Sequence, residues 1–274
     1  MKFIHRIGLR ATASQRKELE SLGVKLPADI VLPGGNSLLA FDVDESHPNW
    51  PALSAVFRKW HVSDLPRTEF AKTEIQAAKW LNLMSDWHHG YPQPNDDAFG
   101  YREATYDLSE YCPQCGVGLK QKAPFQMRGE PKWGPNGILQ LNWIFDEYFV
   151  TPEVWATVFE PSGIHCRPVL SIGGSELESV VQLVVEQEID IVTKGLRMER
   201  CARCGRVKYV PITKGRFPPI AGEPATRMVK TKQYFGSGAS ASKAVLISHE
   251  LSLVFAAENI RGASMRPVAE REGI

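Results

Sequence analysis

Five cysteines are the residues of this 274-residue chain whose types and spacing most directly suggest chemistry. Four of them form two C-x-x-C-G motifs, Cys112–Gly116 and Cys201–Gly205. Two intervening residues let a tight turn point both sulfurs at one ion, and structural zinc sites close tetrahedrally with four such ligands. A glycine after the second cysteine can adopt a positive φ, which turns the backbone away from the metal. We therefore predict one shared Zn²⁺ bound by Cys112, Cys115, Cys201 and Cys204.

The two motifs are far apart in the sequence. Residues 116–200 separate the two cysteine pairs, whereas the pairs of common zinc ribbons are about 15–20 residues apart. Loop-closure entropy grows only with the logarithm of length, so a spacer about fivefold longer costs roughly 1.4 kcal/mol. Structural zinc contributes on the order of 10–16 kcal/mol, which exceeds this cost. A whole sheet can therefore be inserted between the two motifs.

Other interpretations of the cysteine pairs stay open. Each pair could bind its own metal with other ligands, act as a redox dithiol, or carry no site. A thioredoxin-like site places one C-x-x-C between a strand and a helix, whereas both pairs here precede strand-like runs, at 117–122 and 206–211. The fifth cysteine, Cys166, is interpreted as a buried thiol rather than a ligand or nucleophile.

With both motifs and its C-terminal run, the chain resembles the bacterial double-CXXCG motif proteins. The shared features are the two C-x-x-C-G motifs and a tail that comprises Phe235–Gly236, a helix through Leu251, Ile260–Ala263 and Pro267–Val268. The resemblance covers residues 110–274. It implies that the chain is similar to proteins of which some are immunity proteins paired with antibacterial toxins.

Enzyme motifs are incomplete in this sequence. His249–Glu250 begins an H-E-x-x-H zinc-protease motif, but Leu253 stands where the second histidine must be. Residues 236–241 fit the G-x-G-x-x-A dinucleotide pattern, yet the polar residues 230–233 precede them where that pattern requires an apolar strand. We interpret this segment as a turn leading into a helix. The sequence thus predicts a protein with no catalytic residues and no organic cofactor.

Two further features concern surfaces. The loop Trp87–Pro92 places aromatic and histidine residues beside glycine and proline, which suits a partner surface or the rim of a pocket. The alternative is a loop folded onto the core. Acidic clusters at 42–45, 96–97 and 146–147 are interpreted as solvated turns, because nothing in the sequence fixes the spacing of their carboxylates.

Charge is balanced overall but uneven along the chain. There are 32 lysines and arginines against 31 acidic residues, so no global charge favours nucleic acid. The segment 194–232, however, holds eleven basic residues against only Glu199 and Glu223, and it contains the second motif. A basic zinc ribbon could contact phosphates. The first functional interpretation is therefore a non-catalytic protein that binds a specific protein partner, such as a cognate toxin. Nucleic-acid binding through 194–232 is the second, and an enzyme with an unrecognised site is the third.

The secondary-structure elements that must position the cysteines include both helices and strands. We expect helices starting at Asn49–Pro51, over 73–84, after Thr151–Pro152, and from Ser240 or Ser242 to about Asn259. We expect strands over 2–8, 28–32, 37–43, 139–143 and 179–192, the last broken at Gln187. Because strands and helices do not alternate regularly, we predict an α+β fold, in which a mixed sheet with flanking helices carries a zinc-ribbon-like site.

The expected organisation is an α+β region at 1–111 and a zinc-ribbon-containing domain at 112–274. Apolar runs are too short for a transmembrane helix, and Met1–Leu9 lacks the apolar core of a signal peptide. We therefore expect a cytoplasmic protein. An odd number of cysteines in such a reducing compartment argues against a disulfide framework.

Overall fold

The structure is a computed structural model that describes residues 1–28, 30–32 and 35–271. The chain forms two compact units: Met1–Glu74 with Ile212–Gly215, and Ile75–Pro211 with Arg216–Ile274. Both contain helices and strands, so the predicted α+β class is confirmed. The expected boundary near residue 111 falls inside the second unit. Among the described residues, no helix is both long and apolar enough to cross a membrane.

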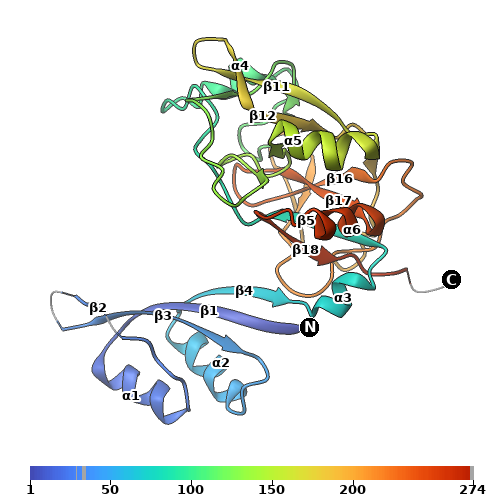
Figure 1. Cartoon of the computed structure of the whole chain (residues 1–274). Coiled ribbons are helices and arrows are strands. Elements are labelled where there is room, and N and C mark those ends of the chain that lie inside the picture. Colours follow the sequence, from blue (N-terminus) through green and yellow to red (C-terminus); the bar gives the residue numbers. More distant parts are fainter. Residues whose placement is uncertain (29, 33–34, 272–274) are drawn as a thin grey trace. The chain divides into compact units, whose positions relative to one another are not determined.

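The first unit is a four-stranded sheet covered by two helices (Figure 1). The strand order is β2-β3-β1-β4 and all neighbours are antiparallel. The strands are β1 (Lys2–Ala11), β2 (Ile30–Val31), β3 (Ser37–Asp44) and β4 (Ser63–Glu69), and the helices are α1 (Ala13–Ser21) and α2 (Trp50–Lys59). Buried side chains alternate along β3, so one face of the sheet packs Leu39 and Phe41 against Leu53 and Phe57 of α2.

The predicted elements of this unit are largely confirmed. Strands expected over 2–8 and 37–43 are β1 and β3, and the helix expected from Asn49–Pro51 is α2. Pro51 lies in the first turn of α2, where its missing N–H costs nothing. The strand expected over 28–32 is found at Ile30–Val31, and residue 29 lies outside the described residues.

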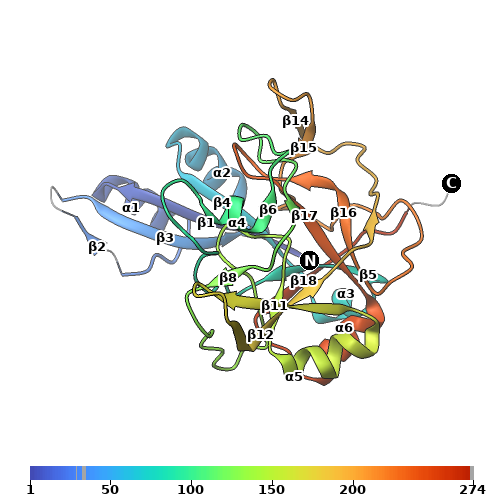
Figure 2. The ribbon, with the colours of Figure 1, turned by 90° about the horizontal axis from the view of Figure 1, so that it is seen from above.

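The second unit holds two larger sheets (Figure 2). The main sheet mixes parallel and antiparallel pairs in the order β14-β15-β16-β17-β5-β18, with β13 beside β16. Its strands are β5 (Trp80–Ser85), β13 (Glu188–Ile189), β14 (Met198–Arg200), β15 (Val207–Tyr209), β16 (Met228–Phe235), β17 (Ser242–Ser248) and β18 (Ala263–Pro267). The other sheet has the order β8-β11-β12-β10-β9, with β8 (Gln126–Met127), β9 (Ile138–Leu139), β10 (Phe149–Val150), β11 (His165–Ser171) and β12 (Glu176–Val184).

Short elements complete the second unit. A small hairpin pairs β6 (Tyr106–Asp107) with β7 (Lys120–Gln121). The helices are α4 (Tyr101–Thr105), α5 (Pro152–Val154) with its irregular continuation to Ser162, and α6 (His249–Ala257), while α3 (Lys72–Gln76) spans the boundary of the units. Thr151 caps α5 as predicted, because its side chain accepts a hydrogen bond from Val154 N. The continuation of α5 packs on α6 through Phe159 and Phe255, whose ring centroids lie 5.5 Å apart.

Two predicted helices are wrong over much of their length. The helix expected over 73–84 ends at Gln76, and Trp80–Ser85 is instead the strand β5 between β17 and β18. The last helix was expected from Ser240 or Ser242, but Ser242–Ser248 is the strand β17 and Ser248 is the N-cap of α6. Both segments are apolar enough to be buried on two sides, and such runs carry no clear period. Pairing within the main sheet decided their conformation.

Two strand predictions also need correction. Only Leu139 of the strand expected over 139–143 lies in a strand, because Ile144 N donates to Leu141 O in a turn and Trp143 adopts φ 71°. The long strand expected over 179–192 is divided into β12 and β13, with residues 185–187 between them. The break expected at Gln187 is thus confirmed.

Candidate metal centre

Four cysteine side chains converge at one point of the second unit. The sulfurs of Cys112 and Cys201 are 3.8 Å apart, those of Cys115 and Cys204 are 3.7 Å apart, and all four lie within 4.8 Å of one another. In a tetrahedral zinc site with bonds of about 2.3 Å, neighbouring sulfurs are about 3.8 Å apart. All five cysteines are free thiols. The structure therefore brings the four predicted ligands together at a spacing that fits a metal ion.

Each C-x-x-C-G motif forms the same turn, which we call a knuckle. In the first, Cys112 N donates to Val117 O at 2.9 Å and Gly116 N donates to Cys112 O at 2.8 Å. In the second, Cys201 N donates to Arg206 O and Gly205 N donates to Cys201 O, both at 2.9 Å. Gly116 and Gly205 adopt φ 82° and 72°, which glycine reaches without the strain of a Cβ atom. These hydrogen bonds close both turns without any contribution from a metal.

The two knuckles differ in what surrounds them. A Cβ atom on Gly116 would lie 2.4 Å from Ala239 O and 2.8 Å from Ala241 N, so the segment 236–241 packs directly on the first knuckle. A Cβ atom on Gly205 would meet nothing within 4 Å, because the second knuckle is the exposed end of the β14–β15 hairpin. The first knuckle is therefore part of the packed interior, whereas the second lies at the end of a hairpin whose cysteines contact the first.

Two basic side chains support the cluster. Lys208 on β15 is only 3% exposed, and its Nζ donates to Cys115 O and Ser240 O, both at 3.1 Å, and to Gly238 O. Arg206 Nε donates to Cys204 Sγ at 3.4 Å, and its guanidinium also donates to Glu110 O at 2.6 Å. Four thiolates around a Zn²⁺ ion leave two net negative charges. These two cations lie where they would offset that charge.

The guanidinium of Arg206 and burial shift the pKa values of two of the thiols in opposite directions. The hydrogen bond from Arg206 lowers the pKa of Cys204 to about 6. Burial raises the pKa of Cys115 to about 12. Since metal ligands must be deprotonated, a bound dication would have to hold the buried Cys115 as a thiolate, and zinc does this with coordinating thiols.

Other residues singled out by the sequence lie away from this cluster. Cys166 is on β11 in the other sheet, half-buried, and burial raises the pKa of its thiol. His249 begins α6, and its Nδ1 has no hydrogen-bond partner among the described residues. The segment 236–241 forms a turn as predicted, although it leads into β17 rather than a helix.

The basic segment 194–232 is partly used within the chain. Six of its eleven basic side chains make hydrogen bonds or ion pairs: Arg200, Arg206, Lys208, Lys214, Lys230 and Lys232. Lys230 is buried against Glu147, with 2.5 Å between Nζ and Oε1. Burial by itself would lower the pKa of Lys230, but the charges of Glu147 and Asp146 raise it. Glu147 is therefore not in a solvated turn, contrary to the interpretation of the cluster 146–147.

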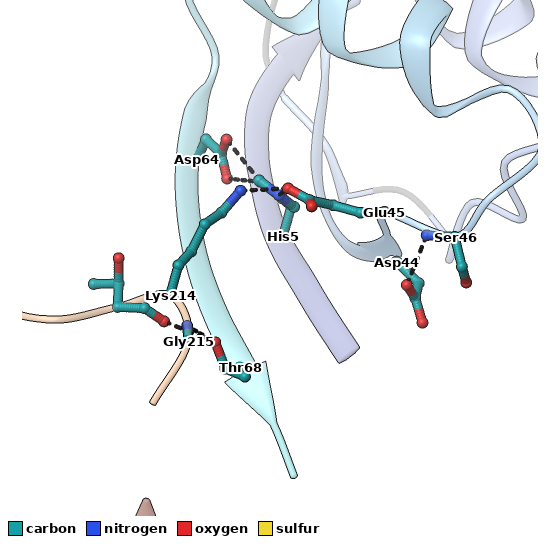
Figure 3. Close-up of polar contacts among 9 residues, drawn as sticks. His5, Asp44, Glu45, Ser46, Asp64, Thr68, Lys214 and Gly215 are labelled. Carbon is teal, nitrogen blue, oxygen red and sulfur yellow. Dashed lines mark hydrogen bonds and ion pairs between the residues drawn. The ribbon is translucent and has the colours of Figure 1, made fainter. Parts of the chain in front are cut away.

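Sequence reasoning missed a charge cluster in the first unit, centred on His5 (Figure 3). His5 is buried on β1, its Nδ1 is 2.8 Å from Asp64 Oδ1, and its Nε2 is 2.8 Å from Glu45 Oε1. Lys214 also pairs with Glu45. Both ring nitrogens thus lie within hydrogen-bond distance of carboxylates. Glu45 lies in the turn after β3 with 27% of its side chain exposed, and there it bonds both His5 and Lys214. No spacing rule connects residues this far apart in the chain.

Comparison of the chain with protein-family models, curated proteins and solved structures gives no match.

Proposed function

We propose that the four cysteines bind one Zn²⁺ and that this ion is structural, in a zinc-ribbon-like arrangement of the two knuckles. The observation that carries the proposal is the convergence of four sulfurs from two motifs within 4.8 Å. Catalytic zinc keeps one position open for water or substrate, whereas four thiolates complete the tetrahedron. The ion therefore has a mechanical role, which is to join the exposed second knuckle to the packed first one.

The protein function that we propose for this scaffold is the non-catalytic binding of a specific protein partner, in the manner of an immunity protein that neutralises a toxin. The resemblance of the two C-x-x-C-G motifs and the C-terminal tail to double-CXXCG proteins supports this proposal. A closed metal site supports it as well, because such a site stabilises a surface without contributing chemistry.

Nucleic-acid binding is the second candidate. Lys194, Arg197 and Arg203 favour it, since they are exposed and belong to the basic segment that contains the second knuckle. Against it, more than half of the basic side chains in 194–232 already bind partners within the chain. A phosphate-binding surface would give an affinity for RNA or DNA that falls steeply with salt and weakens in Arg203→Ala. Absence of such binding at physiological salt leaves the protein-partner proposal in first place.

The test of the proposal is co-expression of the chain with the product of each gene adjacent to its own. We expect one of these products to arrest growth and the chain to restore it. Cys204→Ser should fail to restore growth because the second knuckle is released, while the matched variant Cys166→Ser should succeed. If no adjacent product is toxic, or if Cys204→Ser protects as well as the unchanged chain, the proposed function is wrong.

A further inference from the structure

The four cysteines of the metal centre differ in how far solvent reaches them. Cys112, Cys115 and Cys201 are buried, with 3%, 5% and 9% of their surface exposed. Cys204 is only half-buried. It belongs to the second knuckle, where a Cβ atom on Gly205 would meet nothing within 4 Å. A small solute can therefore reach Cys204 more readily than the other three.

A second sulfur lies within reach of Cys204. Its Sγ is 3.7 Å from the Sγ of Cys115, which belongs to the other knuckle. The sulfurs of a disulfide are about 2.05 Å apart, so these two atoms need to approach each other by about 1.6 Å to become bonded. The open space around Gly205 lets the second knuckle supply this movement.

A guanidinium lies beside the accessible sulfur. Arg206 Nε donates to Cys204 Sγ at 3.4 Å, and Arg206 Nη2 donates to Glu110 O at 2.6 Å. A guanidinium has more N–H donors than these two contacts use. The remaining donors can bond to an oxygen atom that approaches the sulfur, and charge-assisted donors stabilise negative charge that develops on such an atom. The surroundings of Cys204 therefore suit a reaction with a peroxide.

Cys166 shows that exposure alone does not create this arrangement. Cys166 is half-buried like Cys204, but it has no sulfur contact among the residues that the structure describes. The charge that acts on its thiol is the negative one of Glu160. Cys166 thus lacks both the second sulfur and the cation, and it serves as an internal control.

We propose that Cys204 is a site of reversible oxidation by hydrogen peroxide, with Cys115 as the thiol that completes the reaction. The Cys204 thiolate attacks one peroxide oxygen, the O–O bond breaks, and hydroxide leaves, which gives a sulfenic acid. The Cys115 thiolate then attacks the Cys204 sulfur, forms the disulfide and expels a second hydroxide. Two protons from solvent convert both hydroxides to water, so the two sulfurs lose the two electrons that peroxide gains.

The disulfide replaces one connection between the knuckles by another. It removes two of the four sulfurs that close a tetrahedral zinc site, so a bound ion is released. The bond between Cys115 and Cys204 keeps the hairpin attached to the first knuckle. The release of metal rests on the proposed zinc site, whereas the disulfide depends only on the two sulfurs and their surroundings.

The experiment treats the full chain, loaded with zinc, with hydrogen peroxide. Released metal is measured with a coloured chelator, and the cysteine-containing peptides are mapped by mass spectrometry. We expect one zinc released for each disulfide formed, and the linked peptides should contain Cys115 and Cys204. Dithiothreitol with fresh zinc should restore the starting protein, because thiol–disulfide exchange reverses the bond. Cys166→Ser should behave like the unchanged chain.

Cys112→Ser and Cys115→Ser form a matched pair, because each removes one buried thiol of the first knuckle. Backbone hydrogen bonds close both knuckles, so both variants should keep these turns. Peroxide should still link Cys115 to Cys204 in Cys112→Ser. In Cys115→Ser the reaction should stop at the sulfenic acid of Cys204, which dimedone traps.

Three results would overturn the proposal. They are thiols that stay reduced in excess peroxide, a disulfide in the unchanged chain that joins Cys204 to Cys201 instead of Cys115, and Cys115→Ser protein without dimedone on Cys204. A chain that forms the disulfide between Cys115 and Cys204 without ever having bound zinc would support this proposal and contradict the proposed metal.

Discussion

The four-cysteine cluster of the second unit and the His5 charge cluster of the first unit both join segments that are distant in sequence. Cys112 and Cys201 are 89 residues apart, and Glu45 and Lys214 are 169 residues apart. The charge cluster contains its own counterions, because His5 and Lys214 face two carboxylates. The cysteine cluster contains only sulfur ligands, and its nearest cations, Lys208 and Arg206, bond mainly to carbonyl oxygens. The charge cluster therefore contains groups of both signs, whereas the four sulfurs are spaced so that they could hold a metal ion.

The two clusters also differ in the stability that they can supply. Glu45, Asp64 and Lys214 are 27%, 37% and 44% exposed, and ion pairs at such exposure contribute about 0–1 kcal/mol each. A structural zinc site contributes on the order of 10–16 kcal/mol. Ion pairs of modest strength thus fasten the short segment Ile212–Gly215, whereas the proposed metal would add a much larger contribution at the end of a whole hairpin.

Among variants that keep all four cysteines, the largest loss of stability should come from adding one methyl group to the first knuckle. In Gly116→Ala the new Cβ atom meets the backbone of Ala239 and Ala241 and occupies a positive φ. We expect a loss of about 3–5 kcal/mol in the free energy of unfolding. The matched variant Gly205→Ala adds only backbone strain, so it should lose about 1–2 kcal/mol. Urea unfolding measures both, and equal losses would show that the first knuckle is not packed as described.

A smaller loss of stability is expected when Lys208, which bonds to the backbone around the first knuckle, is replaced. Lys208→Met removes the donor shared by Cys115 O, Gly238 O and Ser240 O and leaves these carbonyls without it. We expect a loss of about 2–3 kcal/mol in the free energy of unfolding and weaker metal retention. The control Lys194→Met changes an exposed lysine and should lose nothing measurable. A stable Lys208→Met protein would mean that this lysine does not support the first knuckle.

The smallest effect concerns the charge cluster. The hydrogen bond from Lys214 is the main reason that the pKa of Glu45 lies below its ordinary value of 4.5. A lowered carboxyl pKa stabilises the fold above the unfolded pKa, and that stabilisation is lost as the pH falls through the folded pKa. Lys214→Met should therefore lose about 0.5–1 kcal/mol at neutral pH.

Well below pH 4.5 the Lys214→Met variant and the unchanged chain should become equally stable. Urea unfolding at the two pH values checks this, and a difference that persists in acid would assign the effect of Lys214 to packing instead of charge.

The cysteine cluster could be anticipated because its residues repeat a short motif. The C-x-x-C-G pattern directly predicts the local turn, and the hydrogen bonds and positive φ values of both knuckles agree with that prediction. The His5 cluster could not be anticipated, because its members come from β1, β4, the turn after β3 and a segment near residue 214. Only the pairing of β1 with β3 and β4 brings three of them together, and register is a property of the sheet.

The prediction of helices and strands has the same limit, because only local signals can be read from the sequence. Thr151 and Pro51 mark helix starts correctly, because a capping hydrogen bond and a proline in the first turn both act within a few residues. The strands β5 and β17 were mistaken for helices, because their buried runs take their conformation from partners across the sheet. Local signals were sufficient where the stabilising contacts are local and failed where they are not.

The most direct test of the account is the metal content of purified single variants, measured by elemental analysis. We expect one zinc per chain in the unchanged protein and in Cys166→Ser, and loss of that zinc in both Cys115→Ser and Cys204→Ser. The two losses should be equal, because either knuckle alone supplies only half of the ligands of one shared ion. A full equivalent of zinc in both knuckle variants, or loss of zinc in Cys166→Ser alone, would contradict the shared site.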